Sequence, residues 1–221
     1  MADQNLNEKL ELLETYKKKH LDLGYEILKA YGGAIYPLDL LALAVLKRSM
    51  SLLCGFCGLI RLKNFICAAP LIRLQLDNCL RFYAAHLVED PHQFSISVLS
   101  GKEIRKLKDQ NGQSMTDYYL TEQFSKEFPD FSWIKKVYKK TSGFIHLSDK
   151  HILSIFGNPQ EDRRIEIIIS ITDEYVPLEF YHEAVDAFIK ITEIVFWLIE
   201  EWIFIKNNPE LLGKLKSCDH E

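Results

Sequence analysis

The sequence predicts an all-α protein, a helical bundle that carries at most one small β-hairpin before its C-terminal helix. Three observations support this fold class. Apolar residues recur every three or four positions through most of the chain, glycine and proline separate the helical stretches, and only one short run is rich in β-branched residues. The chain has 221 residues, of which 48% are hydrophobic and 26% charged, and this balance predicts one folded domain over residues 1–221.

The N-terminal part of the chain is expected to form three helices. The first, over residues 6–31, begins with glutamates and continues with lysines, an order that suits the helix dipole. The glycine pair at 32–33 ends it, and Pro37 can begin the second helix. The third helix is expected from about residue 65 to residue 87, with Pro70 in its first turn or at a kink.

Two patterns of the capping-box kind predict further helix starts. They are the stretch SGKE at residues 100–103 and the stretch SMTD at residues 114–117. Helices over residues 115–127 and 130–145 are then expected, because Pro129 separates two stretches of helical spacing.

The region from residue 151 to residue 175 breaks the helical pattern. Its stretch RIEIIISIT (164–172) is rich in isoleucine, and HILSIF (151–156) could pair with it as a β-hairpin around the turn GNPQED. A short apolar run can also be a buried helix, so both interpretations stay open. Residues 178–206 form the clearest helix, because apolar residues follow each other at steps of four and three: Ala184, Phe188, Ile191, Val195, Leu198, Trp202 and Ile205.

Charge and composition limit the possible functions. A formal net charge of −4 removes the electrostatic argument for a general nucleic-acid binder and leaves only a local basic patch. The N-terminus has no cationic run followed by an apolar core, so we expect a cytoplasmic protein. Charges interrupt the most apolar stretches, which favours core helices and no membrane partner. Five cysteines are expected to be reduced; Cys54 and Cys57 have redox or zinc spacing, with buried helix cysteines as the preferred interpretation.

Two sets of polar residues recur at steps of four. The two rows consist of Arg73, Asp77 and Arg81, and of Tyr138, Ser142 and His146. On a helix such a step advances about 40° past a full turn, so each set forms one slanting row. If the rows face each other, an imidazole that moves a proton would lie beside a guanidinium that holds phosphate. The alternative is an ordinary row of ion pairs and local hydrogen bonds.

Two weaker patterns lie in and after the second row. The histidines and aspartate of HLSDKH (146–151) could be metal ligands, but such a cluster at a helix end is typically a solvated cap, so no metal is expected. The lysines at 135, 136, 139 and 140 lie beside Trp133 and could receive a nucleic-acid backbone, but a solvated helix face is the preferred interpretation.

The segments PLIRLQLDNCLRFYAA and VYKKTSGFIHLS resemble paired signatures of HEPN-like helical proteins of poorly characterised type, which occur in bacterial defence, toxin and RNA-processing systems. The resemblance covers about residues 65–150 and implies an all-α bundle, a homodimer and no cofactor. In active members it implies a metal-independent endoribonuclease with an arginine followed a few residues later by a histidine. Here Arg81 and His86 have four residues between them, whereas Lys140 and His146 have five, with lysine in place of arginine.

If the chain is active, the resemblance implies cleavage of RNA by its 2′-hydroxyl, with His146 transferring the proton and Arg73 or Arg81 steadying the phosphate charge. The supporting or binding residues would be Asp77, Asn78, Tyr138 and Ser142. Two hypotheses follow: an RNA-directed nuclease or defence-associated relative, and a non-catalytic helical module that binds a nucleotide, an anion or a protein partner. A purely structural domain is a third.

Overall fold

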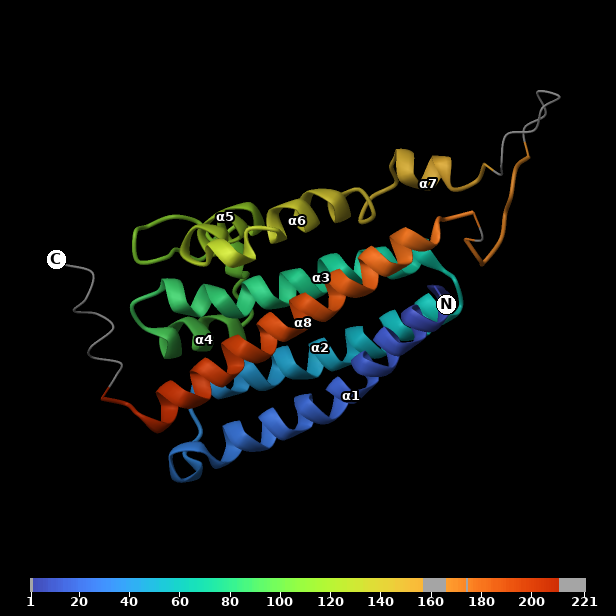
Figure 1. Cartoon of the computed structure of the whole chain (residues 1–221). Coiled ribbons are helices and arrows are strands. Elements are labelled where there is room, and N and C mark those ends of the chain that lie inside the picture. The colour runs from blue at the N-terminus through green and yellow to red at the C-terminus, as the bar shows by residue number, and fades with distance from the viewer. Residues whose placement is uncertain (1, 157–165, 174, 211–221) are drawn as a thin grey trace.

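Four long helices form the bundle (Figure 1). The computed structural model describes residues 2–156, 166–173 and 175–210. The long helices are α1 (Ala2–Lys29), α2 (Pro37–Arg61), α3 (Phe65–Tyr83) and α8 (Leu178–Asn207). Although α8 is the last helix of the chain, it packs against α1 and α3. The predicted all-α class is therefore confirmed.

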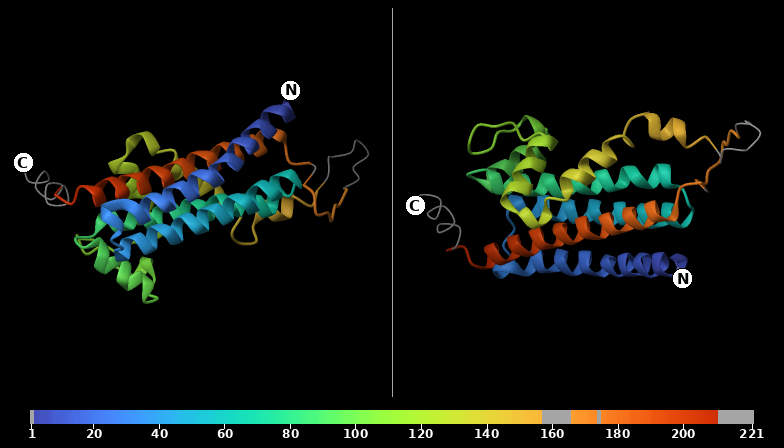
Figure 2. Two further views of the ribbon diagram at one scale, coloured as in Figure 1. Left: turned by 90° about the horizontal axis from the view of Figure 1, so that it is seen from below. Right: turned by 45° about the horizontal axis from the view of Figure 1, so that its top comes forward.

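Shorter helices add a partial second layer (Figure 2). They are α4 (Pro91–Leu99), α5 (Asp117–Glu127), α6 (Ile134–Ser142) and α7 (Asp149–Leu153). Of these, α5 and α6 pack against α3 on the side away from α1, and α4 packs against α2. The second layer thus places residues of α5 and α6 beside the polar residues of α3.

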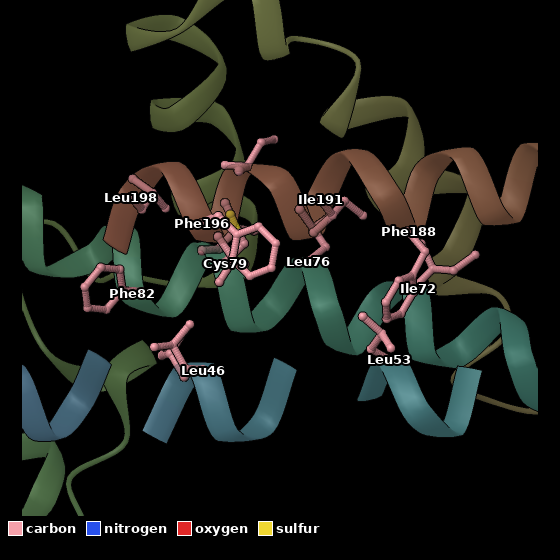
Figure 3. Packing of buried hydrophobic residues seen from close by; sticks show 14 of the residues in the cluster. Leu46, Leu53, Ile72, Leu76, Cys79, Phe82, Phe188, Ile191, Phe196 and Leu198 are labelled. Atoms are coloured by element: carbon pink, nitrogen blue, oxygen red, sulfur yellow. The ribbon is translucent and has the colours of Figure 1, made fainter. Parts of the chain in front are cut away.

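The core lies where α2, α3 and α8 meet (Figure 3). Leu53 of α2, Leu76 of α3 and Ile191 of α8 are completely buried there. The rings of Phe56 and Phe188 stack with centroids 4.3 Å apart and join α2 to α8. Burial of each such side chain contributes roughly 1.5 to 3 kcal/mol, so this contact is a main source of stability.

A chain of buried polar groups crosses this core. His20 donates from Nδ1 to the Tyr16 carbonyl oxygen at 2.7 Å, and its Nε2 lies 2.8 Å from Ser49 Oγ. Gln75 Nε2 donates to Ser49 Oγ at 2.6 Å and to Thr192 Oγ1 at 3.0 Å. This pattern assigns the neutral histidine, with Nε2 accepting from the serine hydroxyl. Burial lowers the pKa of His20, which agrees with the neutral form.

A buried ion pair joins three helices at the opposite end from the α1 N-terminus. Lys206 Nζ donates to Asp39 Oδ2 at 2.8 Å and to the carbonyl oxygen of Ile27 at 2.8 Å. Trp202 Nε1 donates to Asp39 Oδ1 at 2.8 Å, and the amide of Tyr36 donates to Oδ2 at 2.7 Å. The carboxylate is fully satisfied, so its burial is compatible with the fold.

The start of the second layer differs from the prediction. Ser100 does not begin a helix; it ends α4, and its Oγ donates to the carbonyl oxygen of Ile96 at 2.7 Å. The helix α4 was not predicted, although Asp90 caps it and Pro91 occupies its first position. The helix predicted to start at Ser114 begins slightly later: Thr116 caps α5, and its Oγ1 accepts from the Tyr119 amide at 3.2 Å.

The predicted hairpin does not form in the part of the chain that the structure describes. Residues 151–153 belong to α7, because Ser148 caps this helix and its amide donates to His151 Nδ1 at 3.3 Å. Instead of a hairpin, an isolated antiparallel bridge between Phe156 and Ile167 connects the two segments predicted as strands. The predicted turn, residues 157–162, lies outside the described residues.

Among the described helices, α2 alone is long and apolar enough to cross a membrane, by length and composition. In its most apolar window, 44% of the residues are buried inside the bundle. Their contacts with α3 and α8 account for part of the apolar character of this helix.

Candidate functional site

The predicted arginine row of α3 lies in a network of ion pairs. Arg73 Nη2 donates to Asp117 Oδ2 at 2.9 Å, and Arg81 donates to the other oxygen of this carboxylate. Arg81 Nε also donates to Asp77 Oδ1 at 3.0 Å, and Asp77 Oδ2 accepts from Arg48 Nη1 at 2.9 Å. Each carboxylate thus bridges two guanidinium groups. These ion pairs join α2, α3 and α5.

The two predicted rows meet at one point. The guanidinium of Arg73 lies over the ring of Tyr138, 4.3 Å from its centroid, and the Arg73 side chain is only 9% exposed. Asn78 is buried as well, and its Nδ2 donates to the carbonyl oxygen of Val45 at 3.0 Å. These contacts hold α6 and α2 on α3, as the ion-pair interpretation predicts.

His146 does not join this network. Helix α6 ends at Ser142, whose Oγ donates back to the Tyr138 carbonyl oxygen at 2.6 Å. The chain then turns, because Ser148 Oγ donates to the carbonyl oxygen of Gly143 at 2.6 Å. His146 lies in this turn, exposed, with no hydrogen bond or ion pair to any described residue. The predicted row therefore stops after Ser142, and the structure does not bring His146 to Arg73 or Arg81.

The pairs that resemble the family motif have other contacts. His86 is exposed in the turn of 3-10 helix after α3, with its ring stacked 6.1 Å from that of Tyr83. Lys140 Nζ donates to Glu183 Oε2 at 2.9 Å. In the same basic run, Lys135 pairs with Glu122 at 2.7 Å. Two of the four lysines of this run are thus paired with carboxylates.

The two thiols of CGFC differ in their exposure to solvent. Cys57 is buried and Cys54 exposed, so the CGFC pair does not face one environment. Burial raises the pKa of Cys57 to about 11, which makes it an unreactive core thiol. Within the described ranges, no three side chains of histidine, cysteine, aspartate or glutamate are grouped to hold a metal ion.

A cavity that the sequence did not reveal lies at one end of the bundle. It has a volume of about 600 Å³, within the range of small-molecule sites. The N-terminal part of α1, the α2–α3 turn and the segment before α8 meet there (Figure 1). Residues that line it include Leu10, Ile60, Arg61, Lys63, Asp173 and Tyr175.

Lys63 lines this cavity in a backbone conformation that favours glycine. Its φ angle is +54°. The amide of Lys63 donates to the Ile60 carbonyl oxygen at 3.0 Å. The amide of Asn64 donates to the Leu59 carbonyl oxygen at 2.9 Å. These two bonds form a Schellman motif, in which the left-handed residue is usually glycine. In the equivalent motif after α4 that residue is Gly101, with a φ angle of +89°.

Bonds to its carbonyl oxygen hold Lys63 in place. This oxygen accepts from the Asp173 amide at 2.8 Å and from Tyr181 Oη at 3.0 Å. Burial, together with the charge of Asp173, raises the pKa of Tyr181 to about 12, so its hydroxyl stays a donor. The Lys63 side chain is exposed and has no ion pair among the described residues, whereas Arg61 donates to Glu14 Oε1 at 2.9 Å.

Sequence reasoning missed this cavity because its parts are distant in the chain. The one local signal was a lysine where a helix end would normally place glycine, after Arg61 and Leu62. No known protein family, no curated protein and no solved structure matches the chain. The site therefore rests on the geometry of this structure.

Proposed function

We propose that the protein is a non-catalytic helical module that binds a small anionic ligand, such as a nucleotide, in the cavity at the α2–α3 turn. The observation that carries the proposal is Lys63. A cation occupies a left-handed position that glycine would fill at lower cost, while its ammonium group has no protein partner among the described residues. Strained backbone of this kind concentrates at binding and catalytic sites.

The lining of the cavity suits an anion attached to an apolar or aromatic body. The ammonium group of Lys63 supplies a point charge for a phosphate or carboxylate. Leu10 and Ile60 supply apolar surface, and Tyr175 supplies a partly exposed ring on which a base can stack. One carboxylate oxygen of Asp173 accepts from the Ile66 amide at 2.9 Å, and the other can accept a hydrogen bond from a hydroxyl or amino group of the ligand.

The geometry favours this binding module over the RNA-directed nuclease. Cleavage as the family resemblance implies it needs a histidine beside an arginine that has free donors. Arg73 and Arg81 are paired with carboxylates, and His146 has no hydrogen bond to either of them. The HEPN-like relationship, RNA as a ligand, the homodimer and the cytoplasmic location stay predictions.

Isothermal titration calorimetry tests the ligand class. We expect AMP and ATP to bind at least about tenfold more tightly than adenosine, because the phosphate meets Lys63. Lys63→Gln should weaken nucleotide binding by a similar factor, whereas Lys102→Gln, which changes an exposed lysine outside the cavity, should leave it unchanged. Equal affinity of the wild type and Lys63→Gln, or no binding of any phosphate compound, would contradict the proposal.

Incubation with mixed RNA in the absence of metal separates the two hypotheses. The proposal predicts no cleavage by the wild type and no change in His146→Ala. Cleavage by the wild type that His146→Ala abolishes, with an unchanged thermal melt, would instead support the ribonuclease.

A further inference from the structure

An exposed apolar groove runs between α1 and α2. On α1 its rim consists of Leu21, Tyr25 and Leu28, which are 53%, 62% and 44% exposed. Their spacing of four and three places them on one face of the helix. Large apolar side chains gathered on one face of a helix, in contrast to single scattered ones, mark a surface that another molecule covers.

The floor of the groove is formed by a glycine and the side of α2. Gly24 lies between the three apolar residues of α1, and a Cβ atom added there would meet Leu43 Cδ2 at 3.7 Å. Met50 continues the apolar lining on α2, and the hollow has a volume of about 230 Å³. The missing side chain therefore leaves a shallow trough into which side chains of another helix can insert.

The charge that lines the groove is positive. Lys47 lines the groove, and Lys29 follows Leu28 on α1; both are exposed and neither has an ion pair in the described part of the chain. Lys18 is also nearby, but Asp22 pairs with it. Although the whole chain has a net charge of −4, the charged side chain in the lining is the cation Lys47, and Lys29 and the exposed Glu26 flank the groove on α1.

We propose that the groove docks an amphipathic helix of a partner protein, with acidic residues beside its apolar face. Apolar anchors at steps of three and four match the trough, and carboxylates match Lys29 and Lys47. A second copy of this surface would oppose lysine with lysine, so it fits less well. The groove lies along α1 from the Lys63 cavity, so the inference is independent of the proposed function.

Two labelled synthetic helices of about 18 residues test the inference by fluorescence anisotropy with the full chain. Both carry the same leucine face; glutamates border it in one and lysines in the other. We expect the acidic helix to bind at least about tenfold more tightly. Leu21→Glu should remove most of this binding, and Lys47→Glu should remove the preference for the acidic helix.

Leu12→Glu is the matched control, because Leu12 is an exposed leucine of α1 that does not line the groove. It should bind the acidic helix as the wild type does. Circular dichroism confirms that each variant is folded. Equal binding of the two helices, or equal loss in Leu12→Glu and Leu21→Glu, overturns the inference. So does self-association by analytical ultracentrifugation that Leu21→Glu abolishes, because the groove would then be filled by a second copy.

Discussion

Tyr181 Oη donates a hydrogen bond of 3.0 Å to the carbonyl oxygen of Lys63, and so joins the first turns of α8 to the turn between α2 and α3. The same oxygen accepts from the Asp173 amide. The carbonyl oxygen of Lys63 thus fixes both the left-handed backbone of this residue and the Asp173 segment that lines the cavity.

Lys63→Gly should stabilise the protein while it weakens ligand binding. Relief of the left-handed strain favours the variant by about 1 to 2 kcal/mol, and the flexibility of glycine in the unfolded chain offsets part of this gain. We expect a net gain of about 0.5 to 1 kcal/mol in urea unfolding. The reciprocal change Gly101→Lys, in the equivalent motif, should destabilise by a similar net amount of about 0.5 to 1 kcal/mol. A loss of stability in Lys63→Gly would show that its side chain has a structural role.

Arg73→Ala should destabilise the bundle strongly. It leaves Asp117 with one fewer partner and uncovers Tyr138, and the Arg73 side chain is nearly buried. Because Asp117 keeps its pair with Arg81 and is one third exposed, we expect a loss of about 1.5 to 3 kcal/mol in the free energy of unfolding. Arg48→Ala is the control, because the Arg48 side chain is 41% exposed and its pair with Asp77 should contribute less than about 1 kcal/mol. Similar losses in both variants would contradict the different environments of the two pairs.

His20 should make the stability depend on pH in mildly acid solution. Burial lowers its pKa in the folded state, so the unfolded chain binds more protons at the same pH. Its contribution to stability is complete above the ordinary histidine pKa of about 6.5 and is lost as the pH falls through the lowered value. Urea unfolding between about pH 5 and 7.5 should show stability rising with pH, with a smaller slope in His20→Gln. An equal slope in the two proteins would exclude His20 as the cause.

Glu201 should limit stability at neutral pH. Burial, and to a smaller extent the charge of Glu127, raises the pKa of Glu201, and its Oε2 is buried without a hydrogen-bond partner. The folded state therefore binds the proton more tightly than the unfolded chain does. Stability decreases as the pH rises from the ordinary glutamate pKa through the raised pKa of Glu201. Glu201→Gln should raise the melting temperature at pH 7 by about 1 to 2 °C, since the group is only partly buried. Glu200→Gln changes an exposed neighbouring residue and should not raise the melting temperature.

The long helices could be predicted from the sequence, because their apolar spacing and end signals are local. Residues 178–206 were expected as a helix, and α8 covers Leu178–Asn207. Pro37 was expected to begin the second helix, and it begins α2. The helix α4 was missed although Asp90 and Pro91 carried a local signal. The strand pattern at 166–172 did not produce a strand there, because pairing also depends on distant partners.

The site was harder to predict, because tertiary contacts determine it. The contact of Tyr138 with Arg73 agrees with two facing rows. The sequence predicted that the Arg73 guanidinium could bind a ligand phosphate. In the structure it donates instead to the carboxylate of Asp117, 44 residues away in the chain. Nothing local marks Asp117 as its partner. Likewise, the conformation of Lys63 depends on Asp173, which lies 110 positions later in the chain.

The position of α8 between α1 and α3 has a consequence during synthesis on the ribosome. From the end of α3 at Tyr83 to the end of α8 at Asn207, 124 residues must be translated. At about 5 to 20 residues per second this takes about 6 to 25 s. During that interval the nascent chain exposes the leucines and phenylalanines that α8 will later cover. The emergence of α8, and not that of the first helices, should therefore end the need of this bundle for chaperones.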